Sequence, residues 1–195
     1  MSSFAAPFGL KPLYHPSGVI RPKAADLASG YATNLFQYTP VALRVDNAGV
    51  PANAGLQIYP AVGGPIIGTF QGIEYQPADG SGRRYTNRWL ANTVATQIVA
   101  YYTDDPYITY EIQANGTLAE NAMGAQYNIT AEAGNTVVGF STVALDTATA
   151  NPFTANNLLR VVGLTPGPLN AWGDAFPIVQ VQISNHQFVA TRVGF

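Results

Sequence analysis

Residues 107–113, with the sequence YITYEIQ, and residues 178–183, with the sequence IVQVQI, decide the fold class of this chain. In the first stretch Ile108, Tyr110 and Ile112 share one face, and the polar residues between them share the other. In the second stretch the apolar residues at odd-numbered positions alternate with a face that carries two glutamines. A period of two with one apolar and one polar face predicts half-buried strands of an antiparallel sheet.

Short segments of the same kind recur after residue 30, and helical periodicity is nearly absent. They predict further strands at residues 40–45, 56–59, 66–73, 84–90, 97–102, 126–130, 136–143, 158–164 and 188–193. Turn residues that favour positive φ lie between them at residues 46–49, 79–80, 115–116 and 134–135. Only residues 117–124 are expected to make a helical turn. Many short strands of this kind are typical of a sandwich, a jelly roll or a small barrel.

The first 28 residues form a separate segment, which we call the arm. Pro7, Pro12, Pro16 and Pro22 fix φ and remove amide donors, so the arm is expected to be extended. Its apolar side chains are too many for a solvated tail, so the arm should be docked, either on its own domain or on a neighbouring subunit. The residues that would anchor it to a partner are Phe4, Phe8, Leu10 and Tyr14. We therefore predict an extended Pro-rich arm (1–28) and one all-β, antiparallel, jelly-roll-like β-sandwich domain (29–195).

The composition of the chain argues against several functional classes. The chain of 195 residues is 10% charged, with 9 basic and 11 acidic residues and a net charge of −2, so no basic surface for nucleic acid is expected. No apolar run is long enough for a membrane span. The absence of cysteine removes disulfides and thiolate metal sites from consideration. We expect neither a nucleic-acid partner nor a membrane partner.

Residues with catalytic potential are scattered along the sequence. His15 and His186 stand far apart and outside any metal-binding spacing, and Ser17 lacks a nucleophile motif. The pair Asp104–Asp105 is better suited to capping a turn than to holding Ca²⁺. The glutamates together with 11 tyrosines and two tryptophans would suit carbohydrate binding, although such aromatic residues also serve sheets and interfaces. We expect no enzyme activity, no cofactor and no metal.

The densest group of cations consists of Arg83, Arg84 and Arg88, with Trp89 beside them. Arginine and tryptophan are frequent at protein interfaces, so these four residues are candidates for docking an acidic partner surface. A solvated hairpin explains the same residues equally well.

Several long blocks of the chain together resemble the head decoration, or cement, proteins of tailed bacteriophages. They are residues 7–18 (PFGLKPLYHPSG), 28–41 (ASGYATNLFQYTPV), 68–93 (GTFQGIEYQPADGSGRRYTNRWLANT), 102–116 (YTDDPYITYEIQANG), 158–164 (LLRVVGL) and 170–188 (NAWGDAFPIVQVQISNHQF). The resemblance spans nearly the whole chain and carries no catalytic motif.

The resemblance implies a jelly-roll sandwich on the exterior of the capsid, made in the host cytoplasm and then incorporated into the virion. There it would bridge subunits of an HK97-type major capsid protein. It also implies self-association, as a homodimer in preference to a homotrimer. The alternative that the residues leave open is a carbohydrate-binding sandwich module of the adhesin or tail-fibre type.

Overall fold

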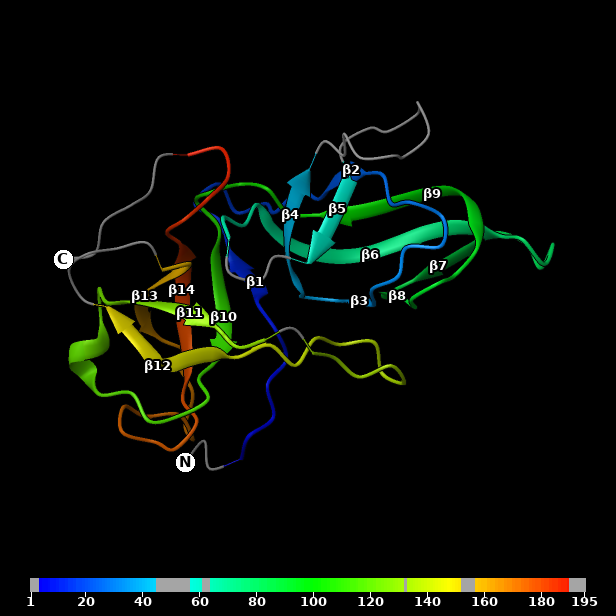
Figure 1. The fold of residues 1–195 in the computed structure, drawn as a ribbon. Coiled ribbons are helices and arrows are strands. Elements are labelled where there is room, and N and C mark those ends of the chain that lie inside the picture. The colour runs from blue at the N-terminus through cyan, green and yellow to red at the C-terminus, as the bar shows by residue number, and fades with distance from the viewer. Residues whose placement is uncertain (1–3, 45–56, 61–63, 132, 152–156, 190–195) are drawn as a thin grey trace.

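The structure, a computed structural model, describes residues 4–44, 57–60, 64–131, 133–151 and 157–189. Within these residues the regular elements are β-strands and one 3-10 turn, η1 (Glu120–Ala122), and the pairings between strands are antiparallel. Two large sheets form two lobes (Figure 1). The predicted all-β fold of antiparallel sheets in the sandwich class is confirmed.

The first sheet contains six strands, and its centre is formed by the two stretches that decide the fold class. In spatial order the strands are β1 (Lys11–Tyr14), β10 (Thr109–Gln113), β14 (Ile178–Ile183), β13 (Leu159–Leu164), β11 (Gln126–Ile129) and β12 (Leu145–Asn151). Tyr110 lies opposite Val181 and Ile112 opposite Val179, and all four side chains are fully buried. The alternation in the sequence thus becomes the buried face of this sheet.

The second sheet also contains six strands. Its order is β2 (Lys23–Ala25), β9 (Ala95–Tyr102), β6 (Gly68–Pro77), β4 (Pro40–Arg44) and β5 (Gln57–Pro60), with β7 (Arg84–Thr86) paired to β6. A small two-stranded sheet of β3 (Leu35–Phe36) and β8 (Arg88–Trp89) belongs to the same lobe. Phe70, Ile73 and Trp89 are among the largest side chains in its core.

Each lobe has its own hydrophobic core, and neighbouring residues divide between the two. Val41 packs in the core of the second lobe, whereas Ala42 packs in the core of the first. In the same way, Ile67 packs in the core of the second lobe and Ile66 in the core of the first. Because successive residues of an extended chain point to opposite sides, these segments lie between the two cores and join them.

A chain of buried hydroxyls also links the lobes where β6 begins and β9 ends. The Thr69 amide donates to Thr103 Oγ1 at 3.0 Å, and the two threonine hydroxyls lie 3.2 Å apart. Thr103 Oγ1 in turn lies 3.1 Å from the hydroxyl of Tyr110. Burial raises the pKa of Tyr110, and the Thr103 hydroxyl partly opposes that effect. Gly68 lies against this junction, and a Cβ there would be 1.9 Å from the carbonyl oxygen of Thr103.

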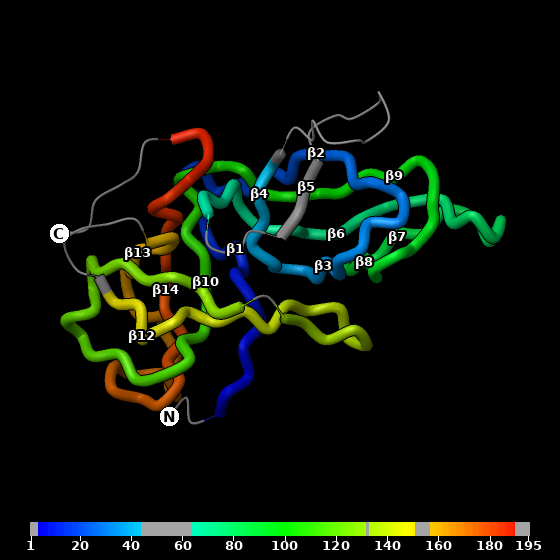
Figure 2. The backbone as a smooth tube through the Cα atoms, viewed as in Figure 1, coloured from blue at the N-terminus to red at the C-terminus, as the bar shows by residue number. Residues whose placement is uncertain are grey.

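The arm crosses both lobes and docks on its own chain (Figure 2). Its two strands, β1 and β2, are edge strands of the first and second sheets. The Ala6 amide donates to Gln113 Oε1 at 2.7 Å, and Gln113 Nε2 donates to the Phe4 carbonyl at 2.9 Å. Within this chain, the arm strands β1 and β2 are therefore paired with the chain's own sheets.

Some predicted elements differ from the structure. Residues 136–143 form a turn instead of a strand, and the neighbouring strand β12 was not predicted. Residues 84–90 are divided into β7 and β8. Phe188 and Val189 lie in a turn, while the rest of predicted strand 188–193 and the predicted turn at 46–49 lie outside the described residues. The helical turn expected within residues 117–124 is present as η1.

Candidate functional site

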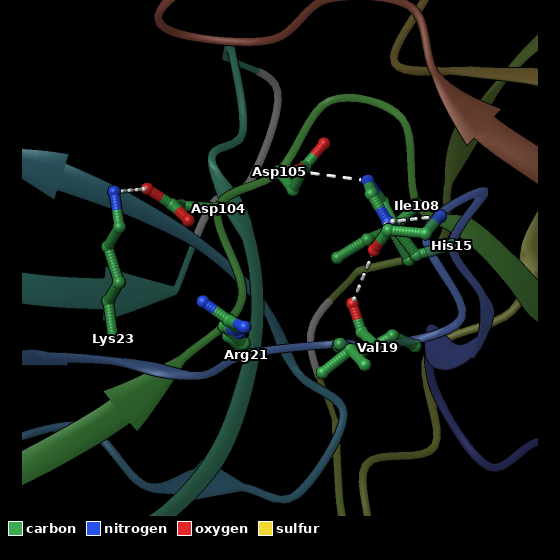
Figure 3. Close-up of a pocket in the computed structure, with 9 residues that line it drawn as sticks. His15, Val19, Arg21, Lys23, Asp104, Asp105 and Ile108 are labelled. Atoms are coloured by element: carbon green, nitrogen blue, oxygen red, sulfur yellow. Dashed lines mark hydrogen bonds and ion pairs between the residues drawn. The ribbon is translucent and has the colours of Figure 1, made fainter.

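A cavity of about 510 Å³ opens where the chain crosses twice between the lobes. The first crossing is the part of the arm between β1 and β2, which contributes His15, Ser17 and Arg21. The second is the connection between β9 and β10, which contributes Asp104 and Asp105. Figure 3 shows side chains from both crossings pointing toward one another.

The two crossings are joined by a serine, histidine and aspartate relay. The His15 Nδ1 atom lies 2.7 Å from Ser17 Oγ and accepts the Ser17 amide at 3.1 Å. The His15 Nε2 atom lies 3.1 Å from Asp105 Oδ2. Because Nδ1 is an acceptor, the proton of a neutral His15 sits on Nε2 and is donated to Asp105.

The relay contains the three residue types of a hydrolytic triad, but the two backbone amides next to the Ser17 hydroxyl are already bonded. A hydrolase needs free donors to stabilise an oxyanion. The Ser17 amide is bonded to His15 Nδ1, and the Gly18 amide is bonded to the His15 carbonyl at 2.8 Å. The donors beside the hydroxyl are therefore occupied, and the relay shapes the turn at residues 15–18.

An ion pair joins the start of β2 to the connection between β9 and β10. Lys23 Nζ lies 2.5 Å from Asp104 Oδ2, and this contact raises the pKa of Lys23 (Figure 3). Arg21 forms no ion pair with another described residue. In the described part of the chain, no group of three or more histidine and acidic side chains is placed to hold a metal ion. None of the described helical segments is long and apolar enough to span a bilayer.

The predicted arm anchors have different environments. Phe4 and Tyr14 are exposed and remain available to a partner. Phe8 is half-buried and lines a groove of about 450 Å³ with Tyr38 and Phe140, whose rings stack at 5.9 Å. Leu10 is fully buried in the first core. Leu10 therefore contributes to the stability of the fold and offers no surface to a partner.

The three clustered arginines are separated by their contacts. Arg83 Nη2 lies 3.0 Å from Glu74 Oε1. Arg84 Nη2 donates to Ser81 Oγ at 2.9 Å, and Arg88 Nη1 donates to the Val137 carbonyl at 2.6 Å. Arg84 and Arg88 nevertheless line one cavity of about 300 Å³, whereas Arg83 pairs with Glu74.

Trp89, predicted beside the arginines as a partner residue, is a core residue of the second lobe. Its side chain is buried, packs edge-on against Tyr75 at 5.4 Å, and donates its indole N–H to the Tyr31 carbonyl at 3.3 Å. Like Leu10, it presents no surface for docking.

Residues 134–141, which we call the strap, form a turn, whereas the sequence predicted a turn only at residues 134–135 and a strand from residue 136. The strap leaves the first lobe and lies against β3 of the second lobe, where the Gln37 amide donates to Gly139 and the Ser141 amide donates to Gln37, both at 2.9 Å (Figure 1). Asn135 Oδ1 accepts the Val137 and Val138 amides at 2.8 and 3.0 Å. Asn135, already part of the predicted turn, caps this longer turn, and Gly139 adopts a φ of 84° at its end.

Comparisons with known proteins do not assign the chain to a group. No protein-family model, curated protein or solved structure matches it.

Proposed function

We propose that the chain is a structural virion protein that decorates and cements the exterior of a tailed-phage head by bridging HK97-type major capsid protein subunits. The sequence blocks quoted above are the first support. The second is the way the fold presents apolar groups. A protein that binds other proteins needs exposed apolar side chains in fixed positions, since ordering them on binding costs free energy.

The strap is the observation that carries this proposal. Val137 is 80% exposed and Val138 is 53% exposed. Their backbone groups are nevertheless held by protein, because both amides bond to Asn135 while Arg88 and Asn87 donate to the two carbonyls at 2.6 and 3.1 Å. The fold thus holds the backbone of two valines in place and leaves their side chains exposed to solvent. A fixed, exposed apolar surface of this kind is suited to contact with another protein.

A bridging protein also needs a second contact away from the first. Phe4 and Tyr14 of the arm are exposed, and Figure 1 shows the start of the described arm, in dark blue, away from the tip of the strap. The arm and the strap are therefore suited to two different neighbours in a shell. Two linked weak contacts give a long-lived attachment through effective concentration.

Self-association is the remaining part of the proposal. The strands β12 and β7 lie at sheet edges in the described part of the chain. Free edges pair readily, and symmetric closure is the usual result. We expect a homodimer, with a homotrimer as the other closed form, on the virion exterior after synthesis in the host cytoplasm.

The test uses heads assembled without this protein and the full chain added back. Substituting both Val137→Ser and Val138→Ser should weaken attachment roughly tenfold or more for each valine buried in the interface. The matched control is Val94→Ser, which alters a valine that is 63% exposed elsewhere on the second lobe. Unchanged occupancy of the double variant would show that the strap is not the contact.

A second measurement addresses the function as a whole. Mass spectrometry of purified virions should find the chain at a copy number close to that of the major shell subunit. Abundance in infected-cell lysate combined with absence from finished particles would refute a role in the head.

A further inference from the structure

The outer face of the second sheet carries two tyrosines beside a charged pair. We call the four residues Glu74, Arg83, Tyr85 and Tyr101 the tyrosine platform. Glu74 on β6 lies opposite Tyr85 on β7, while Tyr101 on β9 lies opposite Gly72. Gly72 has no side chain, so nothing at that position separates Tyr101 from Glu74.

The platform is held in one geometry by its own contacts. The Tyr101 hydroxyl donates to Glu74 Oε1 at 2.8 Å, and Arg83 Nη2 reaches the same oxygen at 3.0 Å. The hydrogen bond to Glu74 raises the pKa of Tyr101. The rings of Tyr85 and Tyr101 lie 6.1 Å apart at an angle of 33°. These contacts reduce the number of rotamers that a ligand would otherwise have to order.

Two parts of the platform are left without a role in the folded chain. The Tyr85 side chain is 74% exposed, and its hydroxyl bonds to none of the described residues. Both contacts to Glu74 use Oε1, so Oε2 accepts no hydrogen bond from a described residue. The platform therefore combines an open aromatic face with a positioned, unused carboxylate oxygen.

We propose that the tyrosine platform binds neutral carbohydrate. The apolar C–H face of a sugar ring stacks on Tyr85, and a sugar hydroxyl donates to Glu74 Oε2 while a neighbouring hydroxyl accepts from the Tyr85 O–H. The ligand carries no net charge because Arg83 balances Glu74. The inference concerns a second site and stands independently of attachment to a head.

Other ligand classes fit the platform less well. A nucleic acid would bring phosphates toward Glu74, and the cations near Tyr85 are already engaged: Arg83 by Glu74, Arg84 by Ser81 and Arg88 by the Val137 carbonyl. A dry protein interface would strip water from the carboxylate and leave Oε2 without a donor, which is costly. Sugar hydroxyls supply that donor and keep the site hydrated.

The experiment titrates the full chain with cellohexaose, chitohexaose, maltohexaose and laminarihexaose by calorimetry and by tyrosine NMR shifts. At least one sugar should bind in the micromolar to low millimolar range and shift the Tyr85 and Tyr101 signals. Tyr85→Ala should weaken this binding about tenfold or more. The matched control is Tyr107→Ala in the connection between β9 and β10, a tyrosine that is 58% exposed, and it should leave binding unchanged.

A variant that keeps the rings tests the role of the carboxylate. Glu74→Gln should weaken binding while leaving the far-UV circular dichroism of the chain unchanged. Failure of all four sugars to bind overturns the proposal, as does equal binding by wild type and Tyr85→Ala. If Tyr85→Ala instead reduces attachment to heads and no sugar binds, the platform is a protein contact and the carbohydrate assignment is wrong while the head function stands.

Discussion

Gly68→Ala should be among the most damaging single-methyl additions in the chain. The new Cβ would lie 1.9 Å from the carbonyl oxygen of Thr103 and 2.7 Å from its Oγ1 atom. The closest atom belongs to backbone, so no side-chain rotation relieves the overlap. Thr103 must move away from β6, and the hydroxyl chain that joins the lobes passes through this residue.

The expected cost follows from the contacts that move. Overpacking of a buried position costs about 1–3 kcal/mol. Displacing Thr103 also weakens its bonds to the Thr69 amide, the Thr69 hydroxyl and the Tyr110 hydroxyl, which are 3.0, 3.2 and 3.1 Å long. A hydrogen bond contributes about 1 kcal/mol, so partial loss of the three adds roughly 1–2 kcal/mol. The free energy of unfolding should fall by roughly 2–5 kcal/mol.

Urea unfolding followed by tyrosine fluorescence and by far-UV circular dichroism measures this change. The matched control is Gly64→Ala, where an added Cβ meets nothing within 4 Å. The control should change stability by at most about 1 kcal/mol. If Gly68→Ala is as stable as Gly64→Ala, the close approach of β6 to Thr103 does not describe the folded protein.

Two further substitutions have defined outcomes. The raised pKa of buried Tyr110 means that, above about pH 10, the unfolded chain releases this proton while the folded chain keeps it, so stability falls as pH rises. Tyr110→Phe should cost about 1 kcal/mol at neutral pH and make the alkaline loss of unfolding free energy less steep, and an unchanged slope contradicts the assignment. Asn135→Ala removes the acceptor of the Val137 and Val138 amides, so hydrogen exchange at these two amides should accelerate with little change in global stability. Protection equal to wild type would mean that Asn135 does not hold the strap.

The strands of the fold were predictable where the sequence alternates and is buried on one side. Residues 109–113 and 178–183 are strands because Tyr110, Ile112 and Val181 repeat with a period of two toward one core. The strand predicted at residues 136–143 was wrong. Two adjacent valines there resemble part of a strand, but Asn135 accepts hydrogen bonds from both of their amides and so stabilises a turn.

The division into two cores was not predicted, because it depends on which face each alternating residue meets. The sequence around Val41 and Ala42 alternates equally well beside one core or between two. The long-range pairing of β4 with β6 places this segment between the lobes, so that Val41 faces one core and Ala42 the other. Local periodicity carries no information about such partners.

The predicted site residues show the limit of reading clusters from sequence. Arg83 and Arg84 are adjacent in the chain but have different partners, Glu74 and Ser81, because successive side chains of an extended segment point to opposite sides, while Arg84 and Arg88 line one cavity. Leu10 was expected to anchor the arm to a partner and Trp89 to join the arginines in docking one, yet both fill cores. The platform combines Glu74, Arg83, Tyr85 and Tyr101 from three neighbouring strands, a grouping that requires the register.

The placement of β1 and β2 at the sheet edges constrains how a newly made chain matures. The arm is translated before its pairing partners β9 and β10, which follow some seventy to one hundred residues later. Until the arm pairs with them, the free edges of β9 and β10 can form hydrogen bonds with a strand of another chain. Closing such long loops is slow, so the nascent chain passes through a period in which two copies can pair through the unpaired edges of these strands.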